Sequence, residues 1–371
     1  MITKAQRDKL GRMRQATDRL DRLLCQLGRQ GLQRVTEASA TELQAMAQLA
    51  HNAGLIKAER ELESLRTAVG RYLARDPVFS TASWTSRLNR LWLLNRATRS
   101  ALKTAEQPAD VVHLTGEARR RYQLLTEPLT VQPLGAEGWV SDSGFMGITV
   151  YLRALKHGEL FSATNARPTD WFGEDPRRLM GMPMSDHQPF TIHELCHGGF
   201  ELFGAKVSAD RRLSLHRDLD LRPAPNLGSR AYDDIAASEW VELVDRLATE
   251  ARRPIDRGTS VLAFLRPSAM GELVIDDKFA RARMPLVDRR GAEVFIEVPL
   301  RVEKGPVVDN LQLIAAGSPP VGWFGRVTQR GSELVFAPMT AMWETQVAIS
   351  WRRRVRHVQE LHLSLETLEK R

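Results

Sequence analysis

The chain has 371 residues, of which 43% are hydrophobic and 26% charged, and its net charge is +8. These proportions are typical of a globular protein with two or three domains. The two cysteines, Cys25 and Cys196, lie far apart, which excludes a disulfide framework and a CxxC metal pair. No apolar run approaches the roughly 20 residues of a membrane-spanning helix, and the N-terminus lacks a signal-peptide core. We therefore expect a cytoplasmic protein without membrane contact.

The positive charge is concentrated at the N-terminus. Residues 1–108 hold 19 Lys and Arg against 10 Asp and Glu, a net charge of +9, whereas the remaining residues hold 34 against 35, a net charge of −1. A basic region of this kind indicates either solvated helix faces or a phosphate-bearing or acidic partner. DNA, RNA and acidic protein all stay open as its ligand.

Apolar residues recur with helical spacing through the first part of the chain. This pattern predicts helices over 3–28, from Ser39 to about Asn52, over 55–74 and over 81–104. Short connections between four amphipathic helices are typical of a bundle, so we predict a helical domain over residues 1–107.

The pattern then changes to the alternation of β-strands. We predict a β-rich domain over 118–252, with a strand at 122–131, a loop at 135–144, a hairpin at 145–153 and 159–164, and a helix near 233–249. A second β-rich domain over 258–340 carries short strands and a helix at 308–316. The predicted fold class is α+β, with small barrels or sandwiches of an OB-like kind.

The last segment, residues 343–371, places its apolar residues on one side of a helical wheel, which predicts a C-terminal amphipathic helix. Four arginines gather at its start: Arg352, Arg353, Arg354 and Arg356. They indicate either the polar back of a packing helix or a surface that binds nucleic acid or a partner protein.

One motif carries a specific chemical hypothesis. His193-Glu194-x-x-His197 matches HExxH, in which two histidines on one helix face bind Zn²⁺ and the glutamate activates a metal-bound water. The alternative is a strand, turn and strand, because Gly198 and Gly199 follow the motif directly and disfavour a longer helix. The sequence offers no clear third ligand, since Phe203 stands where one zinc-peptidase pattern needs histidine. We therefore predict extended chain here and no metal or other cofactor, with zinc as the alternative.

Two segments carry a resemblance to known proteins. GFMGITVYLRALKHGELFSATNARP (Gly144–Pro168) and FELFGAKVSADRRLSL (Phe200–Leu215) resemble bacterial proteins encoded beside SWIM zinc-finger proteins. The resemblance implies an accessory role in a multi-component system and supplies no active-site residue. The SWIM zinc ligands themselves are absent from this sequence.

These observations predict a non-catalytic accessory or adaptor protein that binds other protein subunits and associates with nucleic acid. Two alternatives stay open. One is a zinc metallopeptidase that uses His193 and His197 as ligands and Glu194 as base. The other is a purely structural subunit that binds partner proteins.

Overall fold

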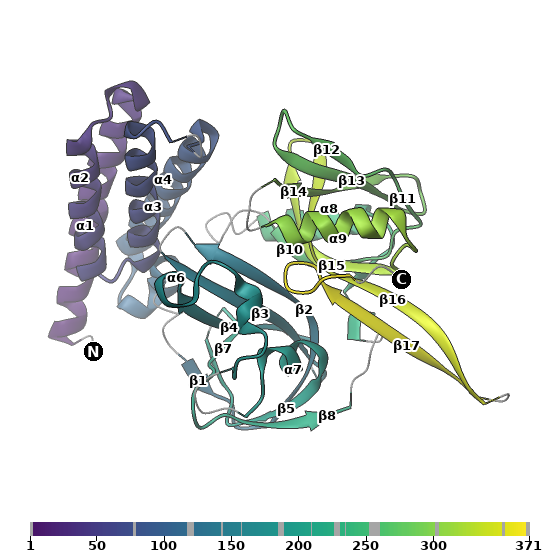
Figure 1. Ribbon diagram of the computed structural model, residues 1–371. Helices are drawn as coiled ribbons and strands as arrows, with labels where there is room; N and C mark the ends of the chain where they lie inside the picture. The colour runs from purple at the N-terminus through teal and green to yellow at the C-terminus, as the bar shows by residue number, and fades with distance from the viewer. Residues whose placement is uncertain are drawn as a thin grey trace. The chain divides into compact units, whose positions relative to one another are not determined.

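Four long helices make up the N-terminal unit, residues 1–121, of the computed structural model (Figure 1). They are α1 (Lys4–Gln30), α2 (Glu37–Asn52), α3 (Ile56–Leu73) and α4 (Thr81–Thr104), followed by the short α5 (Val112–Thr115). Their apolar stripes are buried, as at Leu20, Leu62 and Leu91. The predicted helical bundle is therefore confirmed.

The structure describes most of the chain. Not described are residues 1–2, 77–78, 117–121, 142–143, 157, 185–188, 209, 226–230, 234, 252–259, 301–303, 351–352 and 369–371, nor the side chains of 113, 250–251, 345–350 and 353–358. Among the described residues, no helix is both long and apolar enough to cross a bilayer.

The second unit, residues 122–371, contains two small barrels. The five strands of the first are β2 (Leu129–Ser141), β3 (Phe145–Ala154), β4 (Leu160–Pro168), β5 (Gly199–Phe203) and the broken strand β6–β7 (Lys206–Ser208 and Arg212–Leu213). They are ordered β7–β4–β3–β2–β5, and only β4 and β7 among these neighbours run parallel. Between its third and fourth strands lie α6 (Thr169–Phe172) and α7 (Ile192–His197). The edge strands β1 (Tyr122–Leu124) and β8 (Asp220–Ala224) pair with β6 and β5.

The second barrel repeats this plan. Its strands are β10 (Ser260–Leu265), continued by β11 (Ala269–Met270), then β13 (Arg281–Val287), β14 (Glu293–Pro299), β15 (Gly322–Arg330) and β16 (Glu333–Ser350). The order is β13–β14–β16–β15–β10, with β14 and β16 parallel, and β11 pairs with β13 to close the circle. The helix α9 (Gly305–Ala316) again lies between the third and fourth strands, whereas α8 (Val241–Ala251) precedes the barrel.

Both barrels therefore share one circular strand order: first, second, third, fifth, fourth. Five strands in this order, a parallel third–fifth pair and a helix after the third strand define the OB-fold arrangement. The predicted α+β class with OB-like barrels is confirmed. A third apolar cluster, which includes Leu134, Tyr232, Phe264 and Phe324, joins the two barrels.

The predicted C-terminal helix is wrong. Residues 353–362 form a strand, β17 (Arg353–His362), which pairs antiparallel with β16 in a long ribbon (Figure 1). Leu361 of β17 is buried in a barrel core, as are Leu363 and Leu365 in the turn that follows the strand. A helical wheel could not exclude this pattern, because the segment also carries the β-branched residues that favour strands.

The predicted loop at 135–144 is also wrong over most of its length, because β2 continues to Ser141. The glycines of this segment allow neighbouring side chains to pack closely against the strand, and they do not form a turn. A Cβ atom at Gly135 would meet Thr340 and Phe324, and one at Gly138 would meet Leu365 and Pro176. Glycine within a strand often marks such a close approach.

Candidate nucleic-acid interface and histidine cluster

The HExxH segment is helical where we predicted extended chain. Thr191 caps α7: its hydroxyl accepts from the Glu194 amide, and the Glu194 carboxylate accepts from the Thr191 amide and hydroxyl at 2.7 and 2.9 Å. This capping box stabilises a helix start. Gly198 and Gly199 end the helix without preventing it, and the strand begins only at Gly199.

Because α7 is helical, His193 and His197 lie on one face, with ring centroids 4.6 Å apart. The end of β17 and the turn after it supply further side chains that could bind a metal ion. His197 Nε2 lies 2.8 Å from Glu366 Oε1, and one donor atom from each of His193, His197 and Glu366 lies within 4.8 Å of the others. A second set with the same spacing consists of His197, Glu360 and His362. We call these five residues the histidine cluster.

Burial and neighbouring carboxylates shift the pKa values of the histidine cluster. Burial lowers the pKa of His362 to about 4, so that ring is neutral, and it raises the pKa of Glu360 to about 7. Burial also lowers the pKa of His197, but the hydrogen bond and charge of Glu366 outweigh this and leave it raised. Metal ions bind neutral imidazoles and carboxylates, so a metal at His197 or Glu360 would compete with the proton that these shifts favour.

Glu194 is not part of the histidine cluster. Its carboxylate is engaged at the helix start, and hydrogen bonds from Thr191 lower its pKa. In the described contacts, this side chain stabilises the first turn of α7.

The predicted arginine surface falls largely outside the described part of the chain. Arg352 is not described, and Arg353, Arg354 and Arg356 have a described backbone only, in β17. Their role in nucleic-acid or partner binding stays a prediction.

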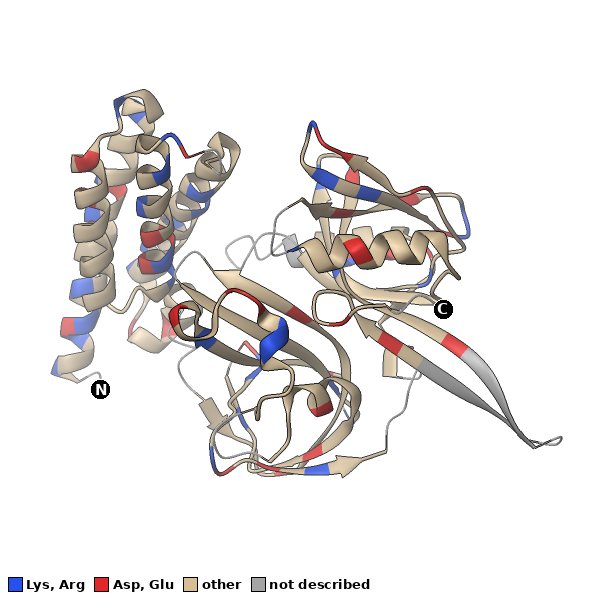
Figure 2. Ribbon diagram, in the orientation of Figure 1, with Lys and Arg blue, Asp and Glu red and all other residues tan. Residues whose placement is uncertain are grey.

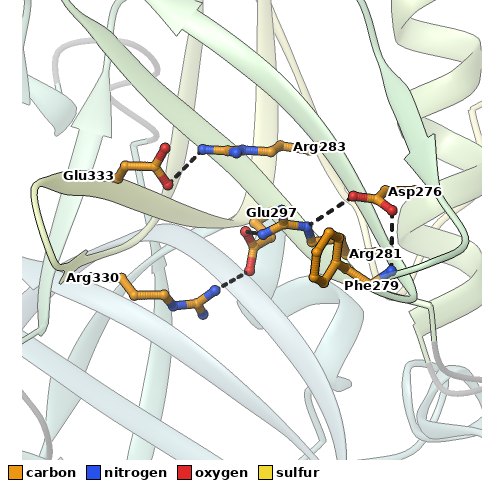
Figure 3. Close-up of polar contacts among 7 residues, drawn as sticks. All are labelled: Asp276, Phe279, Arg281, Arg283, Glu297, Arg330 and Glu333. Carbon is orange, nitrogen blue, oxygen red and sulfur yellow. Dashed lines mark hydrogen bonds and ion pairs between the residues drawn. The ribbon is translucent and has the colours of Figure 1, made fainter.

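A different group of cations lies on the second barrel. We define the β13–β14 face as seven side chains on β13, on β14, at the end of β12 (Val274–Asp276) and the loop after it, and at the two ends of the β15–β16 turn (Figure 3): Asp276, Phe279, Arg281, Arg283, Glu297, Arg330 and Glu333. Arg281 and Arg283 alternate along β13 with the buried Ala282 and Met284, so they point away from the core. This is the face on which OB-folds bind oligonucleotides and oligosaccharides.

Carboxylates hold the arginines of this face in place. Glu297, whose side chain is 10% exposed, accepts from Arg281 at 2.7 Å and from Arg330 at 2.6 Å. Glu333 lies 2.8 Å from Arg283, and Asp276 lies 3.7 Å from Arg281. Ordered arginines cost less conformational entropy on binding than free ones.

Phe279 is the aromatic member of the face, and it is 62% exposed. The charged groups of Arg281 and Lys278 lie 5.1 and 5.5 Å from its ring centroid. An exposed phenylalanine flanked by cations offers an aromatic surface on which a base can stack. No sequence pattern identified this residue, because it lies in a loop without periodicity.

Comparisons with known proteins found no matching family model and no matching curated protein. Among solved structures, the chain is similar to p202 HIN1 in complex with 12-mer dsDNA, at 8% identity and a TM-score of 0.30, over 64% of this chain and 95% of that one. It is also similar to a replication protein A heterotrimer bound to ssDNA, at 10% identity and a TM-score of 0.27, over 57% and 49% of the two chains. The OB-fold assignment made above rests on strand order and pairing.

Proposed function

We propose that the chain is a non-catalytic accessory protein that binds single-stranded nucleic acid on the β13–β14 face. The observation that supports this most directly is the exposed Phe279 ring between Lys278 and Arg281, at the ligand-binding position of an OB-fold. Bases stack on such rings with little regard to sequence, since every base has a π-face.

Exposed apolar side chains extend the same surface. Val274 and Ile275, in β12 (Val274–Asp276), are both exposed and precede Phe279 by a few residues. In a duplex, the faces of the bases are stacked on one another and unavailable to this surface. The face therefore favours single strands, whose unstacked bases can contact aromatic and apolar groups.

The charge of the face is nearly balanced, because Arg281, Arg283 and Arg330 each contact a carboxylate. The net positive charge of the chain lies instead in the N-terminal unit, whose four helices carry many lysines and arginines (Figure 2). Several of these cations are themselves paired: in α4, Arg87 and Arg90 contact Glu61, and Arg99 contacts Asp18 and Asp21. We expect stacking on the β13–β14 face to withstand added salt and any phosphate contacts to weaken with it.

Fluorescence anisotropy on the full chain tests the proposal, with labelled single-stranded DNA and RNA of about 16 nucleotides and a matching duplex. Removal of a stacking ring costs about 1–3 kcal/mol, so Phe279→Ala should weaken single-strand binding by about 5- to 150-fold. Phe279→Trp should retain binding, and Phe279→Leu, which keeps an apolar side chain but no ring, should not.

Val321→Ala is a matched control, because it removes another exposed apolar side chain that is not part of the β13–β14 face. Val321 precedes the first residue of β15, whereas Arg330 of the face is the last residue of that strand. Its affinity should equal that of the unmodified chain. Absence of single-strand binding at about 50 mM salt, where phosphate contacts are strong, would rule out the proposed function. Equal affinities for Phe279→Ala and Val321→Ala would show that the nucleic acid does not bind on this face.

A role as a protein-binding subunit has one specific observation in its favour. On α4, Trp92 and Leu93 are exposed, and the Arg96 guanidinium lies 4.9 Å from the Trp92 ring centroid. An apolar and basic helix face suits an acidic partner protein, in line with the accessory role implied by the resemblance. Affinity purification after nuclease treatment should retain a partner with the unmodified chain and lose it with Leu93→Asp.

The zinc peptidase needs Glu194 as the base beside the metal. Its carboxylate instead accepts two hydrogen bonds from Thr191 at the start of α7. We therefore do not propose peptidase activity.

A further inference from the structure

The histidine cluster gathers donors that metal ions prefer. His193 and His197 come from α7, and Glu366 comes from the turn after β17, 169 residues from His197. Tetrahedral coordination with bonds of about 2.0–2.1 Å places donor atoms roughly 3.3 Å apart. The three donor atoms lie within 4.8 Å of one another, and His197 and Glu366 approach to 2.8 Å, so this spacing lies inside the observed range.

A second feature of the cluster points independently to a ligand. His362 is fully buried, and its Nδ1 is hydrogen bonded to Thr340 Oγ1 at 2.9 Å. Its Nε2 is buried and makes no hydrogen bond of good geometry among the described residues, and the Cys196 backbone is a weak partner only. A ring nitrogen of His362 lies within 4.8 Å of donor atoms from His197 and Glu360. A buried polar atom with only a weak partner is unfavourable, and a bound ion supplies a better one.

The donor set selects the class of metal. Imidazole nitrogen with carboxylate oxygen suits Zn²⁺ and related transition-metal ions, whereas Ca²⁺ and Mg²⁺ prefer all-oxygen sites. Cys196 lies between the two histidines in the sequence, and its side chain is buried. Its thiol, however, belongs to neither set of metal-binding atoms.

We propose that His193, His197 and Glu366 bind one Zn²⁺ ion, with Glu360 and His362 as further donors close to His197, and that this ion is structural. It would join the helix after the third strand of the first barrel to the turn that ends the C-terminal ribbon. Asn310 of α9 donates to the backbone carbonyls of Leu363 and Glu366, so the same turn is attached to the second barrel. The ion would thereby link both barrels through one short segment.

The test is metal binding by the full chain after removal of any affinity tag and of bound metal with a chelator. Zinc content and competition with a chromophoric chelator should give one Zn²⁺ per chain. Loaded with Co²⁺, the protein should show visible absorption without a thiolate charge-transfer band, since no cysteine is a ligand. Zinc should also raise the midpoint of thermal unfolding, because it binds only the folded chain.

His193→Gln is the decisive variant, because His193 is exposed and its replacement leaves the cores intact. It should lower zinc affinity at least tenfold and abolish the thermal shift, and Glu366→Gln should do the same. His51→Ala is the matched control, since His51 also lies 2.9 Å from a glutamate, Glu59, in the N-terminal unit. Absence of zinc binding by the unmodified chain, or equal losses in His193→Gln and His51→Ala, would overturn the proposal.

Discussion

Asp288 provides a stringent test of how the second barrel is held together. It is only 3% exposed and follows β13, at the turn that leads to β14. Its Oδ1 accepts from the amides of Arg290 and Ala292 at 2.8 and 2.9 Å. Its Oδ2 accepts from the Trp240 amide, just before α8, at 2.9 Å. One carboxylate therefore satisfies three backbone donors and joins the turn to the helix.

Asp288→Asn changes little in shape but much in hydrogen bonding. The asparagine oxygen can still accept from the turn, whereas its amide nitrogen would face the Trp240 N–H, donor against donor. A hydrogen bond to a charged group contributes about 1.5–3 kcal/mol, and the two remaining bonds lose their charge. We expect a loss of about 2–4 kcal/mol in the second barrel.

The effect should depend on pH. Desolvation alone would raise the pKa of Asp288, but the amides of Trp240, Ala292 and Arg290 outweigh it and lower the pKa in the folded state. A lowered folded pKa means that the charge stabilises the fold at pH values above the unfolded pKa of about 3.9. This contribution disappears as the pH falls through the folded pKa, so the variant and the unmodified chain should converge in acid.

Segment-resolved amide hydrogen exchange is the suitable assay, because a chain with two units need not unfold in one step. In peptides from α8, β13 and β14, a loss of 2–4 kcal/mol corresponds to about 30- to 900-fold faster exchange. Comparison of the two proteins at each pH cancels the intrinsic rate. Asp277→Asn, at an exposed position in the loop before β13, is the control and should change little. A difference that persists unchanged to pH 3, or none at pH 7, would refute the reasoning.

Other substitutions test the packing of each part. Tyr232→Phe removes a buried hydroxyl with two partners between the barrels and should lower stability by about 1–3 kcal/mol, seen as a lower urea midpoint of tryptophan fluorescence. Leu62→Ala empties a fully buried site in α3 and should cost about 2–5 kcal/mol, followed by circular dichroism of the helical unit. Gly322→Ala would push a Cβ atom into the Phe264 ring and should lower the free energy of unfolding by about 1–3 kcal/mol, measured by thermal unfolding. Gly28→Ala lies in open space on α1 and should raise the free energy of unfolding by about 1 kcal/mol.

The helical unit was predictable because its signals are local. In α1, for example, Leu10, Met13, Leu20 and Leu27 recur on one face, and all four are buried. The C-terminal ribbon was not predictable in this way. Its strand character comes from pairing with β16, as between Ala341 and Leu361, and a wheel drawn on one segment does not contain its partner.

The candidate sites likewise contain some residues that local sequence signals identify and others that only the fold brings together. The spacing of His193 and His197 is local and could be seen in the sequence. Glu366 could not be assigned, because only the fold brings the C-terminal turn to α7. Phe279 is functional in our proposal through its exposure, which no sequence pattern reports.

The two glycines after His197 show why the local backbone was misjudged. They were interpreted as evidence against a helix, since glycine is unfavourable within one. The helix, however, only has to continue from Thr191 to His197, and the chain must then enter β5 at once. A Cβ atom at Gly199 would collide with Gln132 and with the carbonyls of Ala224 and Pro225, so glycine is required by the sheet that follows. The same residues thus end a short helix that presents both imidazoles on one face and begin the strand that was predicted after it.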